Sequence, residues 1–352
     1  MEKFFLSLLL FLPLAIAGQL LGFPPVWIFV TSAIAIIPLA KLIGQATEEL
    51  AARAGASWGG FLNASFGNAT ELIIAIFALR AGLIDVVKAT ITGSIISNLL
   101  LVLGTAMIAG GLRNEKQEFN RTAALASGST LFLAAMALLI PTLLPATAQT
   151  AISIASTNKV SIITAVLMLI MYAATLVFSL RTHKHLYVIE ELPSKELAEG
   201  WTAKKSVFVL VAATLAVAWM SELLVGAINP LLASFGWTPL FLGVIVLALI
   251  GNAAEHASAI TVAMKNKMDL ALQITIGSAT QIAMFVAPVL VLVSIFFPVQ
   301  MNLIFNPFEL AAIILAVLIV NIIIADGESN WLEGLQLVIA YGLMAVAFAL
   351  HP

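Results

Sequence analysis

The pentapeptide GNATE at Gly67–Glu71 lies inside the apolar stretch FLNASFGNATELIIAIFAL, residues 61–79, and GNAAE at Gly251–Glu255 lies inside FLGVIVLALIGNAAEHASAITVAM, residues 241–264. Each stretch places one carboxylate among hydrophobic side chains. A charged side chain at the centre of a bilayer costs about 2.5–3.5 kcal/mol on insertion scales, so an intramembrane carboxylate indicates a function. A structural hydrogen bond inside a helix bundle is the alternative interpretation.

The composition is that of a polytopic membrane protein. Of the 352 residues, 62% are hydrophobic and 10% are charged, whereas soluble domains carry about 25% charged residues. The formal net charge is −2, so no nucleic-acid partner is expected. The chain contains 0 cysteines, which excludes disulfides, thiol nucleophiles and cysteine metal sites. Any metal ion would be held by oxygen atoms or by histidines.

The hydrophobic runs predict an all-α fold of eleven transmembrane helices. A span needs about 20 apolar residues, and the chain provides them at 4–21, 25–43, 61–80, 87–111, 123–145, 160–180, 206–229, 238–264, 270–297, 307–325 and 333–350. The predicted domains are a leading helix over 1–24, five helices over 25–180, a cytoplasmic loop over 181–205 and five helices over 206–352.

Basic residues predict the orientation in the membrane. With these spans, thirteen Lys and Arg fall on the side of the N-terminus and three on the other side. Because cytoplasmic loops carry an excess of Lys and Arg, we expect a cell-membrane protein with a cytoplasmic N-terminus. Lys3, the apolar run behind it, and Ala15 and Ala17 also resemble a signal peptide, and the sequence leaves cleavage of the first helix open.

The two motifs belong to an internal duplication. Adding 184 to a residue number places polar residues and glycines of the first copy on identical residues of the second: Asn68 on Asn252, Glu71 on Glu255, Asp85 on Asp269, and Gly93–Ser94 on Gly277–Ser278. Five spans separate the copies, and because five is odd the copies are expected to be inverted. Inverted repeats with broken helices at the midplane are typical of secondary transporters. Breaks are expected at Gly67 and Gly251.

The duplicated residues predict one cation site shared by the repeats. In each motif Asn and Glu are three residues apart, so they share a helix face. No Lys or Arg lies between 53 and 80 or between 205 and 265, so the two glutamates need protons or a metal ion to offset their charge. Oxygen ligands suit Ca²⁺. The expected site comprises Glu71, Glu255, Asn68, Asn252, Gly67, Gly251, Ser94, Ser278, Asn98 and Gln281. Four of these, Ser94, Ser278, Asn98 and Gln281, have a second interpretation as interhelical hydrogen bonds.

Three further residues are candidates for a gate or proton path. Glu48 and Glu222 precede the motif spans of their halves, and the alternative is an interfacial carboxylate at a helix end. His256 points about 100° away from Glu255 around the helix, so packing or proton relay is favoured over metal ligation.

Two acidic clusters lie in predicted cytoplasmic connections. The glutamates between 190 and 199 are interpreted either as a calcium-regulatory segment or as a solvated linker, since EF-hand spacing is absent. The residues between 326 and 333 are interpreted either as a route for ions or as helix caps at Asp326 or Ser329.

At these residues the chain resembles the calcium/proton exchangers, a branch of the calcium/cation antiporter superfamily, and its short N-terminus resembles that of the prokaryotic members. The resemblance covers nearly the whole chain and rests on GNATE, GNAAEH, GSIISNLLLVLG, GSATQIAMFVAPVLVL and DGESNWLEG. It implies one leading span and two inverted five-span repeats, with Ca²⁺ bound between Glu71 and Glu255. Sodium/calcium exchangers of the superfamily carry extra acidic residues in the partner helices, and spans 87–111 and 270–297 have none.

The function expected from the sequence is a secondary active antiporter that exports cytosolic Ca²⁺ in exchange for H⁺ by alternating access. Exchange of Na⁺, or of another divalent cation such as Mn²⁺, is the alternative. No HExxH motif occurs, and we expect neither an enzyme nor a bound cofactor beyond the transported ions. The expected partners are Ca²⁺, H⁺ and the lipid bilayer, and the sequence leaves assembly into a homo-oligomer open.

Overall fold

The computed structural model describes the whole chain except residues 1, 55–61, 63–64, 148–152, 187–199 and 352, and its described part is almost entirely helical, as predicted. In chain order the elements are α1 (Glu2–Leu8), α2 (Phe11–Leu20), α3 (Pro25–Ala54), α5 (Ala69–Arg80), α6 (Ile84–Ile96), η1 (Ser97–Val102), α7 (Leu103–Gly111), β1 (Gln117–Glu118), α8 (Arg121–Thr147), α9 (Ile154–Val177), η2 (Phe178–Thr182), η3 (Lys184–Leu186), α11 (Ala203–Gly226), α12 (Ile228–Phe235), α13 (Pro239–Phe241), η4 (Leu242–Leu247), α14 (Ala248–Gly251), α15 (Ala253–Ala263), α16 (Met268–Gln281), η5 (Ile282–Val286), α17 (Ala287–Ser294), α18 (Pro307–Ile323), β2 (Glu328–Ser329) and α19 (Trp331–Leu350).

Many of these helices are apolar enough to cross a bilayer. Within the described residues, 7 continuous helices pass the length and hydropathy test, or up to 8 if one bent pair counts as a span. The predicted spans 4–21 and 307–325 correspond to shorter apolar helices, Phe5–Leu20 and Pro307–Ile323. For the predicted span 61–80 the structure describes α5 from Ala69 onward. The chain is therefore a multi-pass membrane protein, and the count of eleven helices remains a prediction.

The second motif interrupts a helix. Pro239–Gly251 and Ala253–Ala263 meet at an angle of 57°, so the break predicted at Gly251 is present. Asn252 at the break has φ −86° and ψ 11°, and Asn68, directly before α5, has φ −110° and ψ 31°. Both asparagines thus lie near the sparsely populated bridge region, where active-site residues often occur. Neither side chain caps its helix, so both amides are free for other partners.

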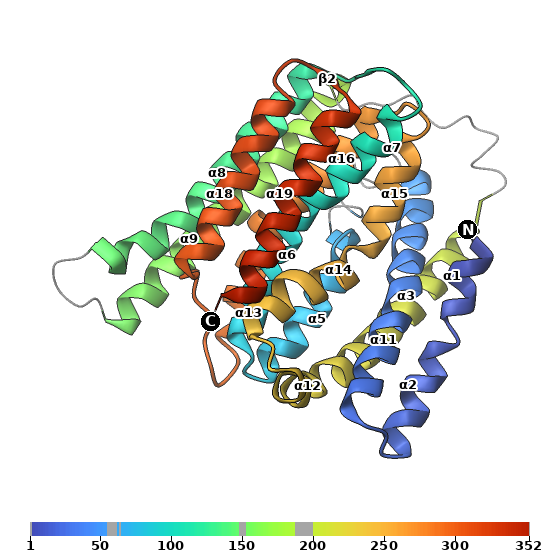
Figure 1. The fold of residues 1–352 in the computed structure, drawn as a ribbon, viewed down its shortest axis with the longest axis vertical. Coiled ribbons are helices and arrows are strands. Elements are labelled where there is room, and N and C mark those ends of the chain that lie inside the picture. Colours follow the sequence, from blue (N-terminus) through green and yellow to red (C-terminus); the bar gives the residue numbers. More distant parts are fainter. Residues whose placement is uncertain (1, 55–61, 63–64, 148–152, 187–199, 352) are drawn as a thin grey trace.

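The bundle has two outer groups of helices. Figure 1 shows α3 and α11 packed along each other on one side, with α8, α9 and α18 on the other side and α6 and α14 between them. Glycines allow the closest crossings, because a Cβ atom at Gly93 would collide with the backbone of Val244, and one at Gly104 would lie 2.8 Å from the Gly334 oxygen. Small residues at such crossings are typical of helix packing in membranes.

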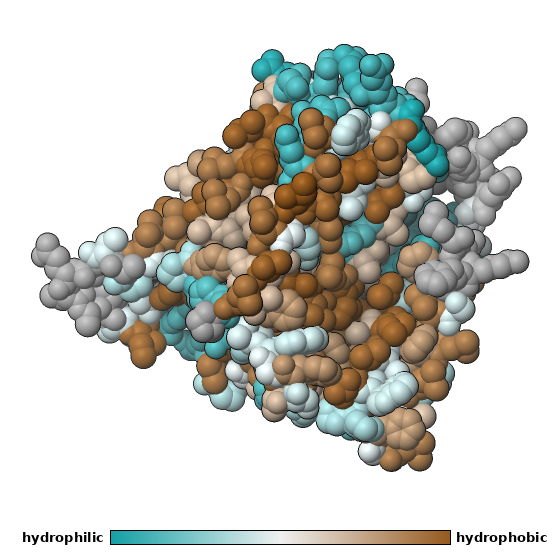
Figure 2. All heavy atoms as spheres, viewed as in Figure 1, coloured by the Kyte–Doolittle hydropathy of each residue, from teal (hydrophilic) through white to brown (hydrophobic). Residues whose placement is uncertain are grey.

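One end of the bundle carries a two-stranded ribbon. β1 pairs with β2 in antiparallel register, Gln117 opposite Ser329 and Glu118 opposite Glu328. Hydrophilic side chains gather at this end in Figure 2, and hydrophobic side chains cover much of the middle of the visible face. The Asn120 amide donates to Asp269 Oδ1 over 2.7 Å. Three connections that we predict to share one side of the membrane, after α7, after α15 and after α18, therefore meet at one end.

Candidate cation site

Six of the predicted site side chains form one continuous hydrogen-bonded network. Its members, in order of connection, are Gln281, Asn68, Ser278, Asn98, Asn252 and Ser94. The smallest separation along the chain between two bonded members is 154 positions. The fold thus brings the two halves of the chain together at the residues that the duplication singled out.

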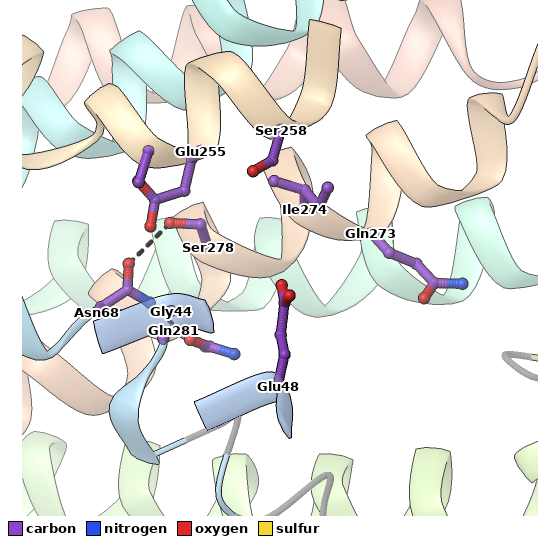
Figure 3. Close-up of a pocket in the computed structure, with 11 residues that line it drawn as sticks. Gly44, Glu48, Asn68, Glu255, Ser258, Gln273, Ile274, Ser278 and Gln281 are labelled. Carbon is purple, nitrogen blue, oxygen red and sulfur yellow. Dashed lines mark hydrogen bonds between the residues drawn. The ribbon is translucent and has the colours of Figure 1, made fainter. Parts of the chain in front are cut away.

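The first motif is bonded to α16. The Asn68 Nδ2 group donates to Gln281 Oε1 over 2.6 Å. Ser278 Oγ donates to Asn68 Oδ1 over 2.8 Å, the bond drawn as a dashed line in Figure 3. Both bonds cross from the first half of the chain to the second. They hold the start of α5, and with it the helix of Glu71, against α16.

The second motif is bonded to α6 and η1. Asn252 Nδ2 donates to Ser94 Oγ over 3.0 Å and to the Ala248 carbonyl over 2.8 Å. Asn98 Nδ2 donates to Asn252 Oδ1 over 2.8 Å and to Ser278 Oγ over 3.0 Å. Asn98 therefore links two pairs, Asn68 with Ser278 and Asn252 with Ser94. It lies in η1, a π-helical segment, and such segments occur frequently at functional sites.

Three buried oxygen atoms at this network have no hydrogen-bond partner in the described part of the chain. They are Glu71 Oε1, Glu255 Oε2 and Asn98 Oδ1. Glu71 is 4% exposed, and the two carboxylates repel each other electrostatically. An unsatisfied buried polar group costs about 1–3 kcal/mol. Oxygens that can only accept, gathered from both halves, therefore suit a cation or added protons.

The carboxylate of Glu71 packs against Gly251. A Cβ atom at Gly251 would lie 3.1 Å from Glu71 Cγ and 3.3 Å from Glu71 Oε1. A glycine at this position lets the carboxylate of one half approach the broken helix of the other half closely. Among the described residues no three His, Asp or Glu side chains cluster as in a dedicated metal centre, so neutral amide or main-chain oxygens would have to complete a cation shell.

A cavity of about 160 Å³ reaches the site from one side. Its lining residues come from α3, the first motif, α15 and α16: Gly44, Glu48, Gly67, Asn68, Ala254, Glu255, Ser258, Gln273, Ile274, Ser278 and Gln281. Figure 3 shows Glu48 pointing from α3 toward the side chains of α15 and α16. Glu48 and Ser258 are exposed, and Glu255 is partly exposed. Glu71 is not part of this lining, so the cavity gives access to the second carboxylate.

The candidates for a gate or proton path separate in the structure. Glu48 lines the cavity, whereas Glu222 is an exposed residue of α11 that does not line it. His256 places Nε2 3.3 Å from Ser97 Oγ, a contact with α6–η1 rather than with a carboxylate. Packing or relay therefore fits His256 better than metal ligation.

The acidic clusters have different outcomes. The glutamates between 190 and 199 lie outside the described residues. In the other cluster the cap of α19 is Asn330, which forms a capping box with Glu333. The cap predicted at Asp326 or Ser329 is therefore wrong, because Asp326 Oδ1 accepts from the Glu328 amide in the turn before β2 and Ser329 pairs in the ribbon.

The sequence interpretation missed five residues of the cavity: Gly44, Ala254, Ser258, Gln273 and Ile274. Ser258 could have been found, since it follows Glu255 by three residues and shares its helix face. Gly44 precedes Glu48 by four residues and likewise shares a face. Gln273 carries no such signal, because its place depends on how α16 packs.

Comparisons with known proteins agree with the sequence resemblance. The family profile described as "Sodium/calcium exchanger protein" matches residues 24–181 and 205–350. A Ca(2+)/H(+) antiporter of Synechocystis sp. is 49% identical over 371 residues, covering 100% of this chain and 98% of the relative. The Ca(2+)/H(+) antiporter ChaA of Bacillus subtilis is 45% identical over 350 residues, covering 99% of each.

A solved structure shares the fold. The structure of native YfkE matches with a TM-score of 0.86 at 43% sequence identity, and the match covers 98% of this chain and 99% of that chain. The similarity therefore spans nearly the whole chain.

Proposed function

The chain belongs to the sodium/calcium exchanger protein family, and from this premise we propose that it exchanges Ca²⁺ for H⁺ across a membrane. The observation that carries the proposal is the set of three buried acceptor oxygens, contributed by Glu71, Glu255 and Asn98, that have no hydrogen-bond partner within the described part of the chain. The two relatives named Ca(2+)/H(+) antiporter, at 49% and 45% identity, support it. Both cover nearly the full length of this chain.

The proposed coupling follows from charge. Two carboxylates are neutralised either by one Ca²⁺ or by two protons, so a site that must be neutral before it can reorient exchanges one for the other. Within the network, Asn98 Oδ1 is the neutral side-chain oxygen that has no donor among the described residues, which makes Asn98 the most direct amide ligand. Asn68 and Asn252 each accept a bond already, and we assign them to positioning together with Ser94, Ser278 and Gln281. Carbonyl oxygens near Gly67 and Gly251 would complete the shell.

We further propose that the chain consists of one leading helix and two inverted five-helix repeats, eleven spans in all. The hydrogen bonds between the two halves support this layout. Ser278 bonds to Asn68, and Ser94 bonds to Asn252. Each residue of one pair lies 184 positions from its equivalent in the other pair. The π-helical segments support it as well. Shifting η1, Ser97–Val102, by 184 gives 281–286, and η5 covers Ile282–Val286.

Alternating access provides the transport cycle. We propose that Ca²⁺ enters through the cavity past Glu48, displaces protons from the two glutamates, and leaves on the other side when protons return to them. The proposed cytoplasmic side is the one that carries the N-terminus and the ribbon of β1 and β2, which would make the cycle an export of Ca²⁺ across the cell membrane. Glu222, outside the cavity, is proposed to act only in a conformation other than this one.

Inside-out membrane vesicles test the proposal. With an acidic interior, wild-type protein is expected to take up Ca²⁺, and Glu71→Gln or Glu255→Gln is expected to abolish uptake while the purified variants keep the thermal stability of a folded protein. Uptake that follows a sodium gradient instead would assign the chain to sodium exchange. Undiminished uptake in either glutamine variant would place the site elsewhere.

A further inference from the structure

Gln117 is a buried amide outside both the hydrogen-bonded network and the cavity. It lies in β1 and is 1% exposed. Its Nε2 group donates to the Ala263 carbonyl over 2.9 Å and to Asn266 Oδ1 over 3.0 Å. Ala263 is the last residue of α15, and Asn266 has a left-handed φ of 57°. The side chain therefore holds the end of the helix that carries Glu255.

The Gln117 side chain also packs against α7. A Cβ atom at Gly110 would collide with Gln117 Oε1 and would lie 2.9 Å from the Ala263 carbonyl. Only a glycine at position 110 lets both Gln117 Oε1 and the Ala263 carbonyl lie this close to α7. α7 continues from α6 and η1, which carry Ser94 and Asn98. Gln117 thus joins the ends of two site helices, one from each half of the chain.

Gln117 is itself held from two directions. Gln117 pairs with Ser329 in the ribbon, and the Phe119 amide donates to the Gly327 carbonyl over 3.0 Å. Asn120 then bonds to Asp269 at the start of α16. The amide is therefore fixed relative to α16 and α19, and through its two donors it fixes α15 relative to α7.

Gln117 Oε1 has no hydrogen-bond partner among the described residues. The side chain is consequently retained by its two N–H donors and by packing. In Gln117→Glu an acceptor oxygen takes the place of the N–H donors and faces two acceptors, the Ala263 carbonyl and Asn266 Oδ1. A methionine would keep the length and lose the donors. Both substitutions therefore remove the donors while nearly keeping the length of the side chain.

We propose that Gln117 is a positioning residue that stabilises the conformation in which the cavity reaches Glu255. The helix it holds, α15, supplies Glu255 and Ser258 to the cavity wall. Ala263 lies eight residues beyond Glu255, about 12 Å along the helix. The Gln117 bonds at this helix end, called the clamp below, therefore control the tilt of α15 and with it the cavity wall. The role of the clamp in transport rests on the proposed function, but its effect on the openness of the cavity can be measured without transport.

The absence of cysteine from the chain permits a direct test. In purified Ser258→Cys protein in detergent, without Ca²⁺, the rate of reaction with a hydrophilic maleimide reports how open the cavity is. Adding Gln117→Met or Gln117→Glu is expected to slow the reaction about threefold or more, since both side-chain hydrogen bonds of Gln117 are lost. Glu118→Gln, on the exposed face of the same strand, is the matched control and is expected to leave the rate unchanged.

A second variant keeps the proposal falsifiable if the Gln117 variants fold poorly. Asn266→Gly removes one acceptor and suits the left-handed backbone, so it is expected to slow the reaction by a smaller factor. Equal rates in the Gln117 variants, Asn266→Gly and the Glu118→Gln control would overturn the proposal. If the Gln117 variants slow the reaction but the wild-type protein does not exchange Ca²⁺ for H⁺, the positioning role of Gln117 would be supported and the proposed transport function would be rejected.

Discussion

The two GNA-containing motifs have nearly the same sequence and different surroundings. Glu71 is 4% exposed and lies against Gly251, whereas Glu255 faces a cavity whose wall includes the exposed Ser258 and Glu48. The pentapeptides cannot cause this difference, because they differ at one position, Thr70 against Ala254. Their neighbours cause it. One carboxylate is sealed between the halves and the other is open to one side.

This asymmetry is what a protein with two exchangeable halves should display in any single conformation. In a transporter built from inverted repeats, the opposite conformation exchanges the roles of the repeats. The proposed cycle therefore requires Glu71 to gain, and Glu255 to lose, the access seen here.

The largest effect is expected from thiol accessibility at equivalent positions. Ile74 and Ser258 are 184 positions apart, yet Ile74 is 2% exposed and Ser258 is exposed. Because thiol modification depends on exposure, Ser258→Cys should react readily with a hydrophilic maleimide and Ile74→Cys should remain unmodified on the same time scale. Ca²⁺ should protect Ser258→Cys. Equal reaction rates would show that the protein does not maintain the asymmetry.

The next effect concerns the two equivalent serines. Ser278 Oγ makes two bonds, to Asn68 and from Asn98, whereas Ser94 Oγ accepts one from Asn252. At about 1 kcal/mol for each bond lost, Ser278→Ala should destabilise the Ca²⁺-free protein by about 2 kcal/mol and Ser94→Ala by about 1 kcal/mol. Thermal unfolding of the two variants measures the difference. A larger loss in Ser94→Ala would contradict the bonding pattern.

A smaller effect is expected where the halves touch. Gly251→Ala brings a methyl group within 3.3 Å of Glu71 Oε1, so the carboxylate must shift. Such crowding costs about 1 kcal/mol at the low end of the usual range, and Ca²⁺ affinity should fall about fivefold. Gly277→Ala is the control, because its Cβ meets no described atom within 4 Å. Unchanged Ca²⁺ binding by Gly251→Ala would mean that the position of Glu71 is not set by Gly251.

The smallest effect is expected at the ribbon, outside the membrane. Hydrogen bonds from Lys116 to Glu328 and to Glu118 raise the pKa of the Lys116 ammonium above its ordinary value. Because the folded pKa is the higher one, the stabilisation is fully present below the unfolded pKa and is lost as pH rises through the folded pKa. Lys116→Met should therefore lower thermal stability slightly at neutral pH and not at strongly alkaline pH, as thermal unfolding at several pH values would show. A deficit that persists at high pH would rule out the ion pairs as its cause.

Much of the site could be predicted because the duplication marks it. Asn68, Asn252, Ser94 and Ser278 were found by one fixed offset, and the structure places all four in one network. Glu48 and Glu222 were predicted as equals, and the structure separates them. Their exposure to the cavity depends on how α3 and α11 pack, and no local pattern reports that. Gln117 was not predicted, since its partners Ala263 and Asn266 are about 150 residues away.

The membrane class, the helical fold and the residues that the two copies share could be predicted from residue patterns, because hydropathy and repetition are local or additive properties of the chain. The packing of the helices determines which asparagine bonds to which serine, which carboxylate faces the cavity and which amide holds the end of α15. These contacts join residues separated by 146 to 213 positions. Their geometry depends on helix crossings and on glycine contacts, which a pattern of residue types does not contain.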